Sequence, residues 1–179
     1  EAAFYGPKID FMAMDALGRE FQLATAQLDF IQPARFGLVY TDTDGKDKKP
    51  VMIHLAIAGS LERFLSVYIE HTAGNFPLWL SPEQVRIIPI AEAHTAYAQK
   101  VFEILKEANI RATLDDSNES MGKKIRNAKM EKLPYFIVVG DKEVEAKTVT
   151  LEARDGESIV LSPEALLARL HEEIKTKKL

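Results

Sequence analysis

The chain has 179 residues, of which 46% are hydrophobic and 28% charged, and it carries no cysteine and a formal net charge of −4. This composition is ordinary for a globular protein of one domain or two small ones. The absence of cysteine excludes disulfides and thiolate metal ligands within the chain. The negative net charge argues against nucleic-acid binding driven by the electrostatic field of the whole protein, so that such binding would need a local basic patch. No apolar run of membrane-spanning length and no basic-then-apolar leader occurs, which predicts a cytoplasmic protein without membrane contact.

The N-terminal part predicts a β-hairpin over residues 8–30, with a turn at residues 15–18. Strict alternation in the second strand places Gln22 and Gln27 on opposite faces, and Gln27 shares its face with Thr25 and Asp29. Such a row of polar side chains predicts either the wet side of a half-exposed sheet or the floor of a polar pocket.

The stretch Val51–Phe64 predicts a strand that leads into a helix through small residues. Glycine and alanine at such a junction let a ligand approach the backbone closely. His54 and Arg63 lie at its two ends and are suited to holding a charged ligand or a metal. On the residues alone, commoner alternatives exist: His54 can be a core or edge histidine whose hydrogen bonds are made within the fold, and Arg63 can form a surface ion pair with a nearby carboxylate.

The second half of the chain follows a proline-containing link and alternates strands with helices, which predicts a small α/β domain with a largely parallel sheet covered on both faces. The expected strands span residues 84–91, 110–114, 135–139 and 148–154, and the expected helices span residues 95–108, 121–132 and 162–177.

The helix expected over residues 121–132 carries a basic patch. Met121, Ile125 and Ala128 recur at helical spacing and predict its buried face, so that its cations are expected to point outward. A charge run of this kind is usually a solvated face, and its functional alternative is a contact with an RNA backbone. The patch consists of Lys123, Lys124, Arg126, Lys129 and Lys132.

Several segments resemble the threonyl-tRNA synthetase family of class II synthetases, in order along nearly the whole chain. They are FYGPKID from Phe4, QLATAQLDF from Gln22, PVMIH from Pro50, GSLERF from Gly59, AGNFPLWLSPEQV from Ala73, DDSNESMGKKIR from Asp115 and LPYFIVVGDKEVE from Leu133. GSLERF resembles motif 3 of the class. The resemblance implies an antiparallel β plus helix remnant of a class II catalytic domain at residues 1–76, a linker at 77–82, and an α/β anticodon-binding domain with a mixed, largely parallel sheet at 83–179.

The resemblance also implies a reaction, in which ATP with Mg²⁺ and threonine give threonyl-adenylate and the threonyl group then passes to tRNA(Thr). His54 matches a zinc ligand of the family, with the remaining ligands outside this chain, and Arg63 matches the motif 3 arginine placed against ATP. Gln22 and Thr25 match adenosine-side positions. Tyr5, Lys8 and Gln27 match positions that line the threonine and ATP site. The full-length protein is expected to be a homodimer.

On the anticodon side the resemblance assigns Asn118, Lys132 and Glu143, and the basic residues Lys124 and Arg126 are candidates for backbone contacts. The chain departs from the family at Leu55, Ala58, Ala24 and Glu152. Motifs 1 and 2 and the other zinc ligands are not in the sequence, so the chain is not expected to aminoacylate alone. The alternative from a different class is a non-catalytic, synthetase-derived protein that binds tRNA or regulates. A generic α/β binding protein is disfavoured by the pairing of QLDF with MIH.

Overall fold

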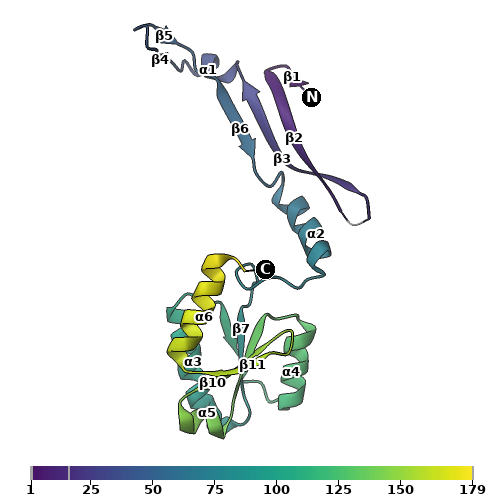
Figure 1. The fold of residues 1–179 in the computed structure, drawn as a ribbon, viewed down its shortest axis with the longest axis vertical. Coiled ribbons are helices and arrows are strands. Elements are labelled where there is room, and N and C mark those ends of the chain that lie inside the picture. Colours follow the sequence, from purple (N-terminus) through teal and green to yellow (C-terminus); the bar gives the residue numbers. More distant parts are fainter. Residues whose placement is uncertain (1, 16, 179) are drawn as a thin grey trace. The chain divides into compact units, whose positions relative to one another are not determined.

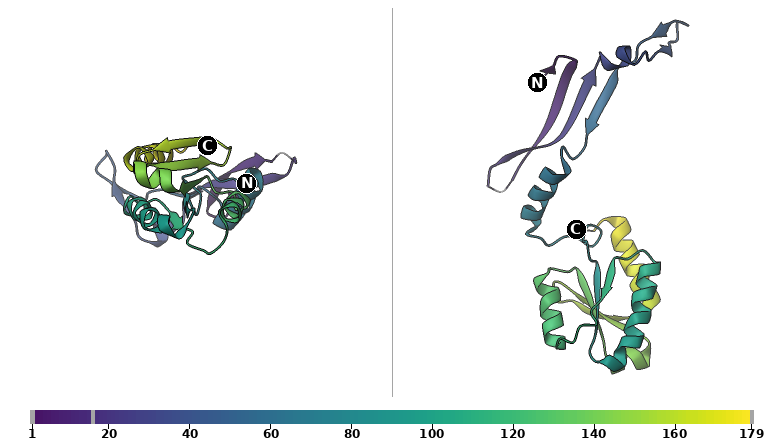
Figure 2. Two further views of the ribbon diagram at one scale, coloured as in Figure 1. Left: turned by 90° about the horizontal axis from the view of Figure 1, so that it is seen from below. Right: turned by 180° about the vertical axis from the view of Figure 1, so that it is seen from behind.

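The computed structural model describes residues 2–15 and 17–178. The chain forms two compact units, Glu1–His71 (unit 1) and Thr72–Leu179 (unit 2), which are drawn in Figure 1 and Figure 2. Glu1 and Leu179, at the ends of the expected domains, and Ala16, within the expected turn, lie outside the described residues. No helix in the described ranges is long and apolar enough to cross a membrane.

Unit 1 is built on a four-stranded antiparallel sheet in the order β1-β2-β3-β6. These strands span Ala2–Ala3, Gly6–Met14, Glu20–Asp29 and Met52–Ala56. A separate ribbon pairs β4 (Tyr40–Thr41) with β5 (Asp47–Lys48), and the helices are α1 (Gln32–Arg35) and α2 (Leu61–Thr72). The predicted hairpin and the predicted strand-to-helix junction are both confirmed.

A β-bulge in β3 corrects one sequence expectation. Phe11 lies opposite Ala24, but the next residue, Met12, lies opposite Gln22, so Leu23 has no partner in β2. One extra residue reverses the alternation beyond it. The expectation that Gln22 and Gln27 occupy opposite faces is therefore wrong, and the side chain of Gln22 lies on the polar face of the sheet, where it donates to Thr25.

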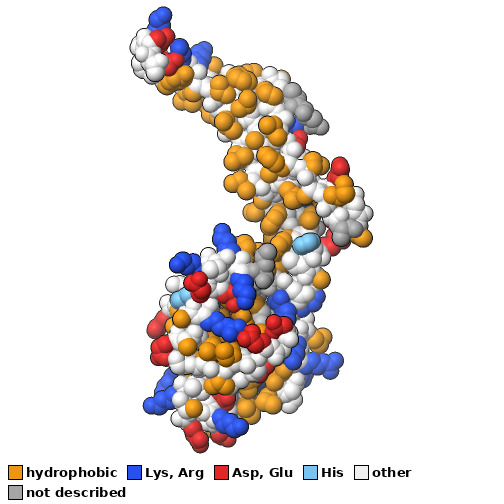
Figure 3. All heavy atoms as spheres, viewed as in Figure 1, with side chains coloured by type: hydrophobic (Ala, Val, Ile, Leu, Met, Phe, Trp, Pro, Cys, Tyr) orange, Lys and Arg blue, Asp and Glu red, His pale blue; other side chains and the backbone are white. Residues whose placement is uncertain are grey.

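The other face of the unit 1 sheet is apolar and uncovered. Ile9 is 65% exposed and Leu55 is 63% exposed, and both side chains point to this face because each lies opposite Ala26 in the register. Apart from Pro33 of α1, the buried apolar side chains of the described residues lie between Leu78 and Leu170, in unit 2. Hydrophobic side chains accordingly gather over the unit 1 sheet in Figure 3. A large exposed apolar surface of this kind marks a contact surface.

Gly6 provides the first testable prediction. A Cβ at this position would lie 2.2 Å from the backbone oxygen of Leu28, so Gly6→Ala must push β2 away from β3. We expect it to destabilise unit 1 by about 1–3 kcal/mol or more through overpacking. The measurement is hydrogen exchange of the β3 amides in the full-length protein. The control is Gly18→Ala, where φ is also positive but no atom lies within 4 Å; equal exchange in both variants would contradict the steric argument.

Unit 2 is built on a five-stranded mixed sheet in the order β11-β10-β9-β7-β8. The parallel strands β7, β8 and β9 span Val85–Pro89, Ala112–Leu114 and Tyr135–Val139, and the antiparallel strands β10 and β11 span Val149–Ala153 and Ser158–Leu161. The helical segments are η1 (Glu92–His94), α3 (Thr95–Glu107), α4 (Met121–Met130), α5 (Asp141–Ala146) and α6 (Pro163–Thr176). The predicted mixed sheet is confirmed, whereas β11, η1 and α5 were not predicted.

The helices of unit 2 cover both faces of its sheet, as Figure 1 and Figure 2 show. On one face, Ala98, Val101 and Leu105 of α3 and Leu166 and Leu170 of α6 pack in a cluster with the strands. On the other face, Ala128 of α4 packs with Ile88, Leu133 and Phe136. Burial of this apolar area, at about 25 cal/mol per Å², is the main source of stability for unit 2.

Two expectations about α4 are wrong. Lys124 is buried with 4% exposure, because its Nζ donates to the backbone oxygen of Asp115 at 2.8 Å, and Met121 is 39% exposed. The helix therefore packs through Lys124, Ile125 and Ala128. A lysine can join a buried face when its stem packs along apolar surface and its amine reaches a backbone acceptor.

Candidate functional site

The residues predicted for the catalytic half come together on the polar face of the unit 1 sheet. Lys8, Gln27 and His54 lie side by side on β2, β3 and β6 in the strand register, and the next row on this face carries Asp10 and Thr25. Since opposite residues of antiparallel neighbours point to the same face, these side chains line one surface. The hydroxyl of Tyr5 donates to Gln27 Oε1 at 3.1 Å, so Tyr5 also belongs to this surface.

Asp10 is the centre of this polar network, although sequence reasoning gave it no role. Its carboxylate lies 2.7 Å from Lys8 Nζ and accepts hydrogen bonds from Gln22 at 2.7 Å and Thr25 at 2.8 Å. The hydrogen bond from Lys8, then that from Thr25, hold the pKa of Asp10 below its ordinary value. The network fixes both predicted adenosine-side residues. The sequence did contain a signal for this role, because Asp10 lies two residues after Lys8 on the same strand and therefore on the same face.

A second carboxylate, Asp29 at the end of β3, holds His54. Asp29 Oδ2 lies 2.9 Å from His54 Nε2, and Oδ1 accepts from the backbone amides of Ile31 and Gln32, both at 2.9 Å. Asp29 is 1% exposed, whereas the His54 side chain is 48% exposed. Burial opposes ionisation, but the hydrogen bonds from Gln32, His54 and Ile31 outweigh it and lower the pKa of Asp29.

Arg63 lies in the first turn of α2. Ser60 precedes this helix, and its Oγ accepts from the Arg63 backbone amide at 3.1 Å, as a helix N-cap does. Gly59 has φ +62, and a Cβ there would lie 3.3 Å from the backbone oxygen of Gln22. The helix start is therefore held against the bulged part of β3. Within the described residues no hydrogen bond or ion pair engages the Arg63 guanidinium, which leaves it available to an anionic ligand.

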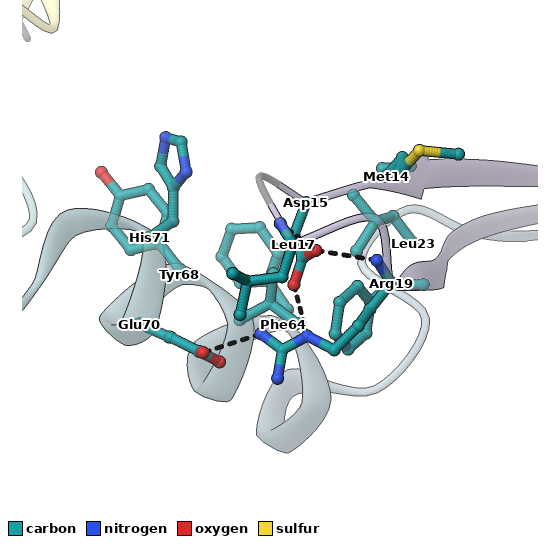
Figure 4. Close-up of a pocket in the computed structure, with 12 residues that line it drawn as sticks. Met14, Asp15, Leu17, Arg19, Leu23, Phe64, Tyr68, Glu70 and His71 are labelled. Carbon is teal, nitrogen blue, oxygen red and sulfur yellow. Dashed lines mark hydrogen bonds and ion pairs between the residues drawn. The ribbon is translucent and has the colours of Figure 1, made fainter.

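A cavity of unit 1 lies elsewhere, between the hairpin end and α2 (Figure 4). It has a volume of about 410 Å³ and an apolar lining that includes Phe21, Leu23 and Phe64. Arg19 bridges its rim through Asp15 Oδ2 at 2.6 Å and Glu70 Oε1 at 2.7 Å. None of the predicted site residues lines it. These exposed ion pairs contribute little to stability, typically less than about 1 kcal/mol.

The predicted anticodon residues lie at both edges of the unit 2 sheet. Asn118 follows β8 and Glu143 follows β9, so both lie at the carboxyl edge of the parallel strands. Lys132 precedes β9 and lies at the opposite edge, where its Nζ donates to the backbone oxygen of Ala73. The structure therefore does not bring Lys132 together with Asn118 and Glu143.

Glu143 is held firmly at the carboxyl edge. Its carboxylate accepts from the Gly140 backbone amide at 2.9 Å and from Thr150 Oγ1 at 2.7 Å. Burial opposes ionisation, but the hydrogen bonds from Thr150 and Gly140 prevail and keep its pKa below the ordinary value. Asn118 and Arg126 are exposed, while Glu152, the departure on β10, accepts from Ser158 Oγ at 2.7 Å.

No group of three or more His, Cys, Asp or Glu side chains within residues 2–15 and 17–178 has the arrangement of a metal site. His54 with its carboxylate partner nevertheless has the form of one metal ligand, because ligating histidines donate their second ring N–H to a carboxylate or carbonyl. His54 and Asp29 therefore fit the supply of one ligand to a zinc site, with the other ligands coming from outside this chain.

Comparison with known proteins agrees with the two units. Residues 1–72 match the tRNA synthetase class II core domain (G, H, P, S and T), and residues 84–173 match the anticodon binding domain. The Threonine–tRNA ligase of Caldanaerobacter subterraneus is 50% identical over 100% of this chain and 28% of its own length. The Threonine–tRNA ligase of Deinococcus radiodurans is 53% identical over 88% of this chain and 24% of its own length.

Two solved structures are also similar. The RNA binding domain of threonyl-tRNA synthetase from Cryptosporidium parvum has a TM-score of 0.88 and 40% identity, and the match covers 96% of this chain and 44% of that one. Prolyl-tRNA synthetase from the same organism, complexed with halofuginone and AMPPNP, has a TM-score of 0.72 and 25% identity over 99% and 39% of the two chains. The chain thus belongs to the threonyl-tRNA synthetase family of class II synthetases and corresponds to a C-terminal portion, about a quarter in length, of its relatives.

Proposed function

We propose that the full-length protein containing this chain activates threonine with ATP and transfers it to tRNA(Thr), and that this chain supplies motif 3 and the anticodon-binding domain. The observation that carries the proposal is the gathering of Tyr5, Lys8, Gln22, Thr25, Gln27 and His54 on one face of one sheet. Gly59 lies against the backbone oxygen of Gln22, which holds the start of α2, the helix that carries Arg63, against β3. A bulge that would otherwise weaken the strand places Gln22 on that face, which supports a functional surface.

Each group has a role that its chemistry suits. Gln22 and Thr25, fixed by Asp10, hydrogen-bond the adenosine, and Tyr5 and Gln27 hydrogen-bond the amino acid. The cations of Lys8 and Arg63 face phosphate. A positioned guanidinium stabilises charge that develops as the carboxylate of threonine attacks the α-phosphate and pyrophosphate leaves.

A zinc ion would be held by His54 together with ligands from outside the described residues, and Mg²⁺ would accompany ATP. When bound, the zinc would act as a Lewis acid that coordinates the amino and hydroxyl groups of threonine. Because valine lacks that hydroxyl, His54 contributes to selection that an apolar pocket does not achieve.

The uncovered apolar face of the unit 1 sheet is explained if the remainder of the class II core packs against it, since the relatives are more than three times as long as this chain. We further propose that residues 1–76 belong to the catalytic domain and 83–179 to the anticodon-binding domain, with 77–82 between them. The full-length protein is proposed to be a cytoplasmic homodimer.

The test is ATP–pyrophosphate exchange by the full-length protein with threonine, valine or no amino acid, followed by charging of tRNA(Thr). We expect exchange that depends on threonine, and charging of that tRNA. Absence of exchange in a protein that still binds tRNA would reject the proposal in favour of a non-catalytic, synthetase-derived tRNA-binding protein.

On unit 2, we propose that tRNA contacts the carboxyl edge of the sheet and the exposed side of α4. Arg126 and Lys129 are exposed on that helix, so they can reach a phosphate backbone, while Asn118 and Glu143 offer groups for anticodon base edges. Since Lys124 is buried, it is a structural residue here. Lys132, at the opposite edge, would contact a different part of the tRNA.

Charge reversal tests this surface. In the full-length protein, Arg126→Glu combined with Lys129→Glu is expected to weaken tRNA binding about tenfold and to lower the salt dependence by about 0.7–0.9 for each phosphate that is no longer neutralised. The control is Lys100→Glu with Lys106→Glu, which makes the same charge change at exposed positions of α3, on the other face of the sheet. Equal weakening by both pairs would show that only the overall charge matters.

A further inference from the structure

Asp29 is a buried carboxylate for which the resemblance provides no role. Among the described residues of unit 1, Asp29 is the only charged residue that is buried, with 1% exposure. Its two carboxylate oxygens have different partners. Oδ1 accepts the amides of Ile31 and Gln32, which form the turn from β3 into α1, and Oδ2 alone faces His54. A buried carboxylate needs such donors, and each of these contacts suits a carboxylate that accepts hydrogen bonds.

The ionised carboxylate determines which ring nitrogen of His54 carries the proton. An ionised carboxylate only accepts hydrogen bonds, so Nε2, which lies 2.9 Å from Oδ2, must carry the proton and donate it. In the neutral ring the lone pair available to a ligand is then on Nδ1. The ring is also held in orientation, because its partner is anchored by two backbone amides.

We infer that Asp29 is a positioning residue that fixes the tautomer and orientation of His54, so that Nδ1 is the nitrogen presented to the proposed zinc ion. The inference rests on the proposed zinc role of His54 and extends it to a residue that does not touch the metal. Carboxylates in this position raise the basicity of the ligand and fix its tautomer, and their replacement usually lowers metal affinity by about 10–100-fold.

Asp29→Asn tests the inference in the full-length protein. The asparagine Oδ1 can still accept from Ile31 and Gln32, so the turn is retained, but the amide nitrogen now faces His54 as a donor. Nε2 must then accept, and the proton moves to Nδ1, where it blocks the metal. We expect zinc affinity, measured by competition with a chelator, to fall by about 10–100-fold while ATP affinity is unchanged.

Asp15→Asn is the matched control. Asp15 has the same pattern in the same unit, since its Oδ1 accepts two backbone amides, those of Leu17 and Arg19, and its Oδ2 accepts from a side chain, that of Arg19. It is expected to leave zinc affinity unchanged. His54→Ala is the second reference and is expected to lose the zinc altogether.

The outcomes separate the two claims. If His54→Ala loses zinc but Asp29→Asn binds it as tightly as the parent protein, the inference is overturned and the proposed zinc role stands. If Asp29→Asn loses ATP affinity as well, Asp29 supports the whole polar face and its specific action on the metal is rejected. If His54→Ala retains zinc, the proposed function of that residue fails first.

Discussion

Replacing His54 by alanine is expected to remove zinc from the full-length protein and to lower kcat/KM for threonine activation by about 10⁴-fold, toward the value for valine, because discrimination of this order requires a site built to bind the hydroxyl. His54 is the only zinc ligand that the resemblance places in this chain, and its half-exposed ring leaves room for a ligand. The measurements are zinc content by metal analysis and ATP–pyrophosphate exchange with both amino acids.

His71→Ala is the control for this change, because His71 is an exposed histidine of the same unit that lines the cavity beside α2. It is expected to keep both zinc and activity. Unit 2 should stay folded in both variants, since its apolar clusters contain residues of unit 2 alone. Unchanged zinc content in His54→Ala would refute the ligand role.

Replacing Arg63 by alanine is expected to lower kcat for pyrophosphate exchange by about 10²–10³-fold, equivalent to about 2.7–4 kcal/mol of transition-state stabilisation. The reason is that Arg63 lies in the first turn of α2, where no group of the described residues engages its guanidinium, so the guanidinium can face charge that develops at phosphate. Exchange kinetics at varied ATP concentration separate this loss from weaker ATP binding, which raises KM instead.

Two further variants define what the arginine provides. Arg63→Lys keeps the charge without the planar fork and should recover part of the rate. Arg19→Ala removes an exposed arginine of the same unit whose ion pairs lie on the rim of the separate cavity, and it should change kcat only a few-fold at most. A rate for Arg63→Ala close to that of the parent protein would exclude this residue from the phosphate site.

The elements of the fold were largely predictable from periodicity. The alternation of β2, the small residues before α2 and the serine before α6 all gave their elements approximately correct bounds. Element β11 was missed because its sequence, SIVL, does not alternate polar with apolar residues, although its exposure in the structure does alternate. The short helix α5 was missed because it follows a buried strand through Gly140 without an apolar stripe of its own.

The candidate site was harder to predict, for physical reasons that three residues illustrate. A period-2 pattern cannot reveal a single inserted residue, so the prediction missed the bulge at Leu23 and placed Gln22 on the wrong face. Lys124 was expected at the surface because charge usually predicts exposure, but a backbone carbonyl within reach of its amine permits burial. Asp29 was placed on the right face, yet its bond to His54 depends on strand pairing between segments 25 residues apart.

The most direct test of the account is a crystal structure of the full-length protein with a non-hydrolysable analogue of threonyl-adenylate. The account predicts the adenosine against Gln22 and Thr25, the threonyl group against Tyr5 and Gln27, and the phosphate near Arg63. An analogue bound away from this polar face, for instance in the cavity between the hairpin end and α2, would contradict it.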